Sequence, residues 1–153
     1  MNNPLVLLAI IVVGIALLYL FAFYPIQHTS YSHFIINGKS FGIAYVASNY
    51  SVWTSGLMNK TITNSTTMLF VFPKPSIYPF WMYDTYSNLD MFWINGTANG
   101  GRIVYIAKNV TSCFVASSCA IYTPNAFANY VLEAKGGFAI RNNITVGSRI
   151  SFG

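Results

Sequence analysis

The chain has 153 residues and a formal net charge of +5, but only 7% of its residues are charged, where globular domains average about a quarter. This length allows one domain with a short extra segment, and the singly scattered Lys and Arg residues form no basic cluster of the kind that binds nucleic acid. Asn, Ser, Thr and Tyr carry the polar surface instead, which suits the exterior of an acidophile such as an archaeon, because carboxylates lose their charge below about pH 4.

The N-terminus contains one continuous apolar run. Residues 5–23 hold no charged side chain, and as a helix they would span about 28 Å, close to the roughly 30 Å of a bilayer's hydrocarbon core. Pro25 ends the run. A cleaved secretory signal is the alternative, but no Lys or Arg precedes the run and no small-x-small cleavage site follows it. We therefore expect a transmembrane anchor helix in residues 1–24, a linker at 25–33 and a β domain at 34–153.

Beyond the anchor, short apolar and β-branched runs separated by turn residues predict strands. Asn37-Gly38 is a type I′ hairpin signal between strands at 33–36 and 40–47. Ser51 can cap a short helix that reaches Met58, and a helical turn is expected at 138–141. Further strands are predicted at 67–72, 80–83, 89–94, 102–110, 129–134 and 148–152. About eight short strands indicate a mainly β fold, a compact barrel-like β sandwich with short helices, preceded by one transmembrane α-helix.

The domain carries four ordered blocks, Gly56-Leu57-Met58, Met68-Leu69-Phe70-Val71-Phe72, Phe80-Trp81-Met82-Tyr83-Asp84-Thr85 and Leu89-Asp90-Met91-Phe92-Trp93-Ile94. In order and spacing they resemble the blocks of the family called domain of unknown function 192. The resemblance continues through Tyr130-Val131-Leu132-Glu133 and covers about residues 40 to 152. It implies no settled activity. Tyr83-Asp84 stands where the family has Lys-Asn, so a function that needs that lysine's charge is not expected.

Two features favour a domain outside the cytoplasm. Six Asn-x-Ser/Thr sequons occur where this composition gives about two by chance, which is consistent with glycan acceptors. All eight Lys and Arg follow the anchor, and by the positive-inside rule this would keep the domain in the cytoplasm. That rule weakens, however, for long segments, which are translocated largely regardless of charge. The alternative is that an Asn- and Thr-rich composition produces sequons incidentally. The sequons begin at Asn49, Asn59, Asn64, Asn95, Asn109 and Asn143.

The second feature is the pair Cys113 and Cys119, the only cysteines in the chain. They could form a small disulfide loop, a soft-metal pair or two free thiols. Structural zinc normally needs four ligands, and the chain offers no second cysteine pair. The disulfide is favoured, and with the sequons it indicates an oxidising compartment outside the cell.

Polar members of the family blocks are the candidate site residues. Asp84 and Asp90 flank a turn and could share a binding cleft with Trp81, Tyr122 and Glu133. Two neighbouring carboxylates can divide acid and base roles if their environments separate their pKa values. We favour the alternative that both aspartates accept hydrogen bonds from backbone N–H groups of the turn.

Neither a metal nor a cofactor is predicted. Thioether and thiolate sulfur atoms suit Cu(I), but the methionines occupy hydrophobic block positions, where filling the core is the favoured interpretation. His28 and His33 both precede the core of the domain, which speaks against Ser-His-Asp catalysis. The methionines concerned are Met58, Met68, Met82 and Met91.

These observations predict a membrane-anchored extracytoplasmic binding or accessory domain, a small subunit of a membrane protein complex or cell-surface assembly, and not an enzyme. The bilayer would be contacted through residues 5–23, and Gly14 and Ala16 would offer a small-residue face to a helix of a larger membrane protein. The alternatives are a copper-binding protein, a small-molecule-binding domain, a carboxylate-based enzyme and a pilin-like filament subunit. No processing site of a basic residue plus Gly or Ala precedes the run, which disfavours the filament subunit.

Overall fold

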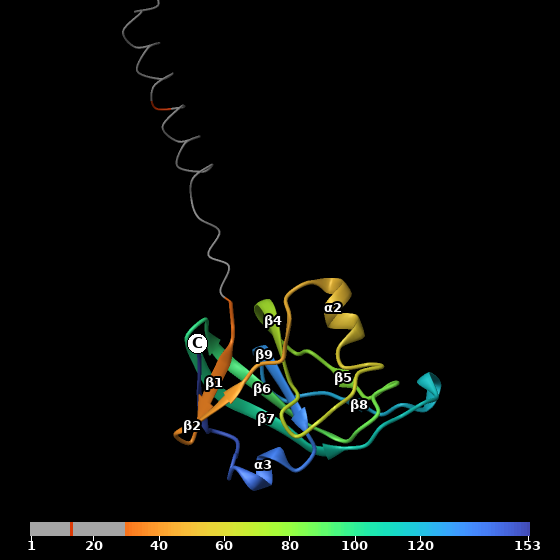
Figure 1. Cartoon of the computed structure of the whole chain (residues 1–153). Coiled ribbons are helices and arrows are strands. Elements are labelled where there is room, and N and C mark those ends of the chain that lie inside the picture. Colours follow the sequence, from red (N-terminus) through yellow and green to blue (C-terminus); the bar gives the residue numbers. More distant parts are fainter. Residues whose placement is uncertain (1–12, 14–29) are drawn as a thin grey trace, which may run out of the picture.

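The structure is a computed structural model that describes Val13 and residues 30–153, and in this part of the chain it is mainly β (Figure 1). Its strands are β1 (His33–Ile36), β2 (Lys39–Gly42), β3 (Tyr45–Ala47), β4 (Thr67–Ser76), β5 (Phe80–Trp81), β6 (Leu89–Thr97), β7 (Gly100–Val110), β8 (Ile121–Tyr122), β9 (Ala128–Lys135) and β10 (Arg149–Phe152). Eight strands form one curled sheet in the order β2-β1-β10-β7-β6-β9-β4-β3, while β5 and β8 form a two-stranded sheet.

The prediction of a mainly β fold is confirmed, but in place of the expected compact barrel-like sandwich the main sheet of eight strands curls into a half-barrel. The long strands β4, β9, β6 and β7 pair side by side in one antiparallel series, so no break divides the strands into two layers. The predicted strand at 40–47 is split: its first part pairs with β1 as β2, and its last part pairs in parallel with β4 as β3. The predicted hairpin is present, with positive φ at both Asn37 and Gly38.

Three short helices accompany the sheet within residues 30–153. They are α2 (Tyr50–Ser55), the 3₁₀ helix η1 (Ala116–Ser118) and α3 (Phe138–Arg141). Two of them, α2 and α3, pack against the two faces of the sheet. In the part of the chain that the structure describes, no helix is both long and apolar enough to cross a membrane. The apolar run at 5–23, except Val13, lies outside the described residues, and so do Gly14 and Ala16.

Both faces of the central strands are buried. All six residues from Leu89 to Ile94 on β6 are buried, and alternate side chains belong to two different apolar clusters. One cluster contains Phe92 and is covered by Phe138 of α3, and the other contains Trp93 and is covered by Trp53 of α2. The strand register therefore decides which of the two clusters a polar side chain reaches.

Strand β4 continues past its predicted end at residue 72. Its ladder with β9 is regular up to Val71 and is irregular from there to Ser76. Pro73 and Pro75 lie in this interval, where they have no N–H to donate to the neighbouring strand. The chain leaves the ladder at this point and, with the segment that leads into β5, forms a wall opposite α2.

Candidate binding site

An open groove of about 420 Å³ lies between α2 and the segment that joins β4 to β5. Its wall is almost entirely aromatic or proline, and its polar members are a threonine hydroxyl and tyrosine hydroxyls. We call it the aromatic groove. Its lining residues are Tyr50, Trp53, Thr54, Phe72, Pro73, Tyr78, Pro79, Phe80 and Trp81.

One wall of the aromatic groove is fixed by Tyr78. The Tyr78 ring stacks on Phe72 with 3.7 Å between the ring centroids and 11° between the planes. The indole N–H of Trp93 donates to the Tyr78 carbonyl oxygen at 2.8 Å, and the Tyr78 hydroxyl donates to the Lys74 carbonyl oxygen at 2.8 Å. Burial raises the pKa of Tyr78 above its ordinary value. The wall therefore exists before any ligand arrives.

The opposite wall is helix α2. It begins after Asn49, whose side-chain oxygen accepts from the Val52 N–H at 3.2 Å, rather than at the Ser51 cap that the sequence predicted. The helix also ends earlier than expected, at Ser55, because Gly56 follows with a φ of 47°. The Trp53 indole N–H donates to the Ala47 carbonyl oxygen at 3.0 Å and anchors the helix to β3.

The aromatic groove adjoins a small cavity of about 30 Å³. Trp53, Thr54, Phe80 and Trp81 line both hollows and so form the boundary between them. We call this space the Glu133 cavity. The rest of its lining consists of Ser55, Gly56, Leu57, Met58, Phe70, Thr85 and Glu133.

Glu133 is the unusual residue of this cavity. It lies on β9, is 4% exposed, and has Met68 and Met91 as its neighbours on the flanking strands. Its Oε2 atom is buried and has no hydrogen-bond partner among the described residues. Burial raises the pKa of the Glu133 carboxyl to about 8, so it is a neutral acid at and below neutral pH. An unsatisfied buried carboxyl costs free energy and is typical of a binding or catalytic site.

The sequence of the β domain matches a known protein family. The model of the domain of unknown function 192 (DUF192), described as "Uncharacterized ACR", matches residues 35–152. The chain belongs to the DUF192 family. No curated protein matches it.

Two solved structures resemble this DUF192 chain. One, from Sinorhizobium meliloti 1021, is described as a candidate transcription regulator; it superposes with a TM-score of 0.67 and 27% identity over 80% of this chain and 95% of that chain. The other is a protein of unknown function from Novosphingobium aromaticivorans, with a TM-score of 0.66 and 21% identity over 83% of this chain and 89% of that chain. Both likenesses concern the fold of the domain.

The blocks that carry the DUF192 resemblance converge on the Glu133 cavity. Gly56-Leu57-Met58 covers it, Phe70 comes from the second block, and Phe80, Trp81 and Thr85 come from the third. Glu133 closes the later block on β9. Segments far apart in the sequence thus supply one small hollow, which makes this cavity, with the adjoining groove, the best candidate for a site.

Asp90 serves the other face of the sheet. It pairs with Ala134, one residue beyond Glu133 in the β9 register, so the Asp90 side chain points away from the Glu133 cavity. Its Oδ1 accepts from the N–H groups of Asn109 at 2.6 Å and Gly137 at 3.2 Å, and its Oδ2 accepts from the Ala139 N–H at 2.7 Å. Asp90 therefore accepts hydrogen bonds from backbone N–H groups, but these belong to β7 and to the start of α3 rather than to the turn that was expected.

The predicted cleft of five residues is therefore not formed. Trp81 and Glu133 line one cavity, but Tyr122 pairs with Phe80 on the two-stranded sheet and lines a different hollow beside Cys113. Asp84 lies at neither place: its backbone N–H donates to the Cys113 carbonyl oxygen at 2.8 Å. The sequence predicted Trp81 and Glu133 as site residues, but not the other residues that line the aromatic groove. The dense interleaving of aromatic residues and prolines in 72–81 was the available signal.

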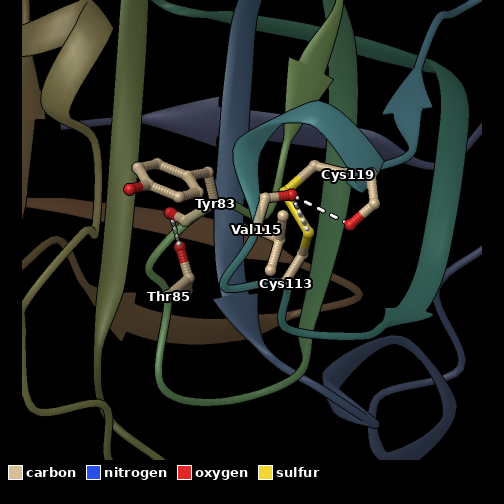
Figure 2. Close-up of a disulfide and its surroundings, with 6 residues drawn as sticks. Tyr83, Thr85, Cys113, Val115 and Cys119 are labelled. Carbon is tan, nitrogen blue, oxygen red and sulfur yellow. Dashed lines mark hydrogen bonds between the residues drawn. A yellow bond between two sulfur atoms is a disulfide. The ribbon is translucent and has the colours of Figure 1, made fainter.

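Cys113 and Cys119 are joined by a disulfide, as the sequence favoured (Figure 2). The bond closes a loop beside the turn that contains Tyr83 and Thr85, and an isolated parallel β-bridge joins the backbones of Tyr83 and Cys113. The disulfide removes both thiolates from the copper alternative, and Met68, Met82 and Met91 are buried in an apolar cluster. Within residues 30–153 and at Val13, no three His, Cys, Asp or Glu side chains gather as a metal site would require.

The remaining predicted residues lie on the surface or outside the described part. His33 is half-buried at the start of β1, and His28 lies outside the described residues. All six sequon asparagines are exposed, namely Asn49, Asn59, Asn64, Asn95, Asn109 and Asn143. Exposure is what a glycan acceptor needs, and whether each is used stays a prediction.

Proposed function

We propose that this chain is a binding domain, held outside the cytoplasm by the apolar run at 5–23, that takes a small and largely apolar molecule in the aromatic groove. The observation that carries the proposal is that this groove adjoins a cavity with which it shares four lining residues, and that in this cavity the buried Oε2 atom of Glu133 has no hydrogen-bond partner among the described residues. The groove volume of about 420 Å³ falls within the roughly 300 to 1,000 Å³ typical of small-molecule sites. An apolar wall with one convergent polar group is the usual composition of such sites.

Binding is better supported than carboxylate catalysis. Divided acid and base roles need a second carboxylate close to the first. Asp90 points to the opposite face of the sheet, and Asp84 lines neither the aromatic groove nor the Glu133 cavity. The sequence alone favoured a larger membrane protein as the partner, whereas the dimensions of the groove favour a small molecule.

The three tryptophans of the chain can report ligand binding through their indole NMR resonances. Trp53 and Trp81 line the aromatic groove, and Trp93 packs against Phe80 with 5.6 Å between the ring centroids. We expect ethylbenzene or 4-ethylphenol, added to the full-length chain in lipid nanodiscs, to shift the indole NMR resonances of Trp53 and Trp81. Replacing Trp81 with Ala removes part of the wall and should weaken binding up to about tenfold, since an aromatic pair contributes about 0.5 to 1.5 kcal/mol.

The matched control is Phe127→Ala. Phe127 is an exposed aromatic residue that does not line the groove, so its loss should leave probe binding unchanged. Absence of any probe-dependent shift at Trp53 and Trp81, or equal weakening by Trp81→Ala and Phe127→Ala, would refute the groove as the binding site.

The external position is supported by the disulfide and by the exposed sequons. We expect the protein from its native membrane to have an intact mass above the 17.0 kDa of the bare chain, and to lose that excess on chemical deglycosylation. The Cys113–Cys119 peptide should be recovered oxidised without added oxidant. A mature chain at the bare mass with free thiols would place the domain on the cytoplasmic side.

A further inference from the structure

The Glu133 cavity has room for one small polar group. A space of about 10 to 15 Å³ accommodates one water molecule. The cavity of about 30 Å³ therefore has room for one or two groups of the size of a water molecule. Trp53, Phe80 and Trp81 line both this cavity and the aromatic groove, so the two hollows lie side by side. A ligand whose apolar body lies in the groove can therefore place its polar end next to Glu133.

Glu133 is the buried polar side chain of the cavity whose carboxyl is still available for a hydrogen bond. The three hydroxyl side chains of the lining already donate to backbone carbonyl oxygens: Thr54 to Ser51 at 2.9 Å, Ser55 to Val52 at 3.4 Å and Thr85 to Tyr83 at 3.2 Å. The Oε2 atom of Glu133 has no partner among the described residues, and the side chain is 96% buried, being 4% exposed. None of the described residues that line the cavity is cationic, so none of them could pair with an ionised carboxylate.

The chemistry of a neutral carboxyl selects the group that would fit. A protonated carboxyl offers one O–H donor and one acceptor oxygen. A hydroxyl group is the smallest group that can accept from the donor and donate to the acceptor, and it occupies about the volume of one water. An ammonium group would require the carboxyl to ionise in a buried apolar place, which burial disfavours.

We propose that the Glu133 cavity binds the hydroxyl end of the ligand, and that the ligand is an uncharged alcohol or phenol whose aromatic or other flat apolar body lies in the aromatic groove. This inference rests on the proposed binding function and adds the chemical class of the ligand. Glu133 then acts as the specificity-determining residue of the site, while the aromatic wall supplies affinity that does not depend on the hydroxyl group.

The test compares 4-ethylphenol with ethylbenzene, which differ in one hydroxyl group. Dissociation constants are measured at pH 5 on the full-length chain in lipid nanodiscs, from the indole NMR shifts, with free probe concentrations set by dialysis. We expect the preference for 4-ethylphenol over ethylbenzene to be about tenfold larger in the wild-type chain than in Glu133→Met, because one buried hydrogen bond is worth about that factor. Met has the length of Glu without its polar atoms and should fold, since replacing an unsatisfied polar group by an apolar one is tolerated.

Glu133→Gln keeps both a donor and an acceptor and should retain most of the preference. Equal ratios in all three proteins, with both probes still bound in the groove, would overturn the hydroxyl assignment and leave the proposed binding function standing. Failure of both probes to bind would overturn the two together. Tighter binding of 2-phenylethylamine than of 4-ethylphenol, with an affinity that rises from pH 5 to pH 9, would identify a cation site instead.

Discussion

Replacing Glu133 with Gln is expected to remove a large pH dependence from the free energy of unfolding. In the folded chain the pKa of Glu133 is raised by burial from 4.5 to about 8, while in the unfolded chain the carboxyl is exposed and titrates near 4.5. Between these two pH values the folded state holds a proton that the unfolded state has released. The free energy of unfolding therefore has its full value below about pH 4.5, falls as the pH rises, and levels off above about pH 8.

The expected fall is about 3 to 5 kcal/mol, because one pKa unit corresponds to about 1.4 kcal/mol. The other residues that line the cavity are uncharged, so no neighbouring ionisation compensates for this loss. The measurement is urea unfolding of the full-length chain, followed by tryptophan fluorescence at a series of pH values from 4 to 9. Glu133→Gln cannot titrate, and its stability should vary much less over the same interval.

Asp84→Asn is the control for this experiment, since it removes another carboxylate that lines neither hollow. Asn is also tolerated at the φ of 51° that Asp84 adopts. The Asn variant should keep the fall in stability between pH 4.5 and 8. If wild type and Glu133→Gln show the same profile, Glu133 is not the buried neutral acid described here.

Replacing Asp90 with Ala is expected to lower the free energy of unfolding by about 3 to 5 kcal/mol. The Asp90 side chain is 1% exposed and accepts three backbone hydrogen bonds, from Asn109, Gly137 and Ala139. Ala would leave these N–H groups without their acceptor in the interior, and each hydrogen bond to a charged group contributes about 1.5 to 3 kcal/mol, not fully additively. The start of α3 and the end of β7 would both lose their hydrogen bonds to the Asp90 side chain of β6.

Asp90→Asn separates the loss of charge from the loss of acceptors. Its one carbonyl oxygen can replace Oδ1, but its NH₂ group would then face the Ala139 N–H, so we expect an intermediate loss of roughly 2 kcal/mol. Both variants are compared with Asp84→Asn in urea unfolding at pH 6. A loss below about 1 kcal/mol in Asp90→Ala would show that water replaces the carboxylate without cost.

Local sequence signals predicted much of the fold because they depend on neighbouring residues alone. Asn37-Gly38 forms the hairpin because both residues tolerate positive φ, and the continuous apolar run that contains Phe70 forms β4 because β-branched and aromatic residues suit a sheet. The pairing of Cys113 with Cys119 followed from there being two cysteines in the chain. The single curled sheet was not predicted, since nothing local states that β3 pairs in parallel with β4.

The sequence by itself determined the family and most strand positions, and it indicated two of the candidate site residues, Trp81 and Glu133, because their blocks are short and ordered along the chain. Only the tertiary structure decided what these residues do. Asp90 and Glu133 looked equivalent as acidic residues of family blocks, but the register of β6 against β9 places them on opposite faces of one sheet. Register follows from long-range pairing, and a shift of one residue would exchange the two faces. That is why one carboxylate holds backbone N–H groups together, while the other has an oxygen atom with no partner among the described residues and lies in a cavity beside an aromatic groove.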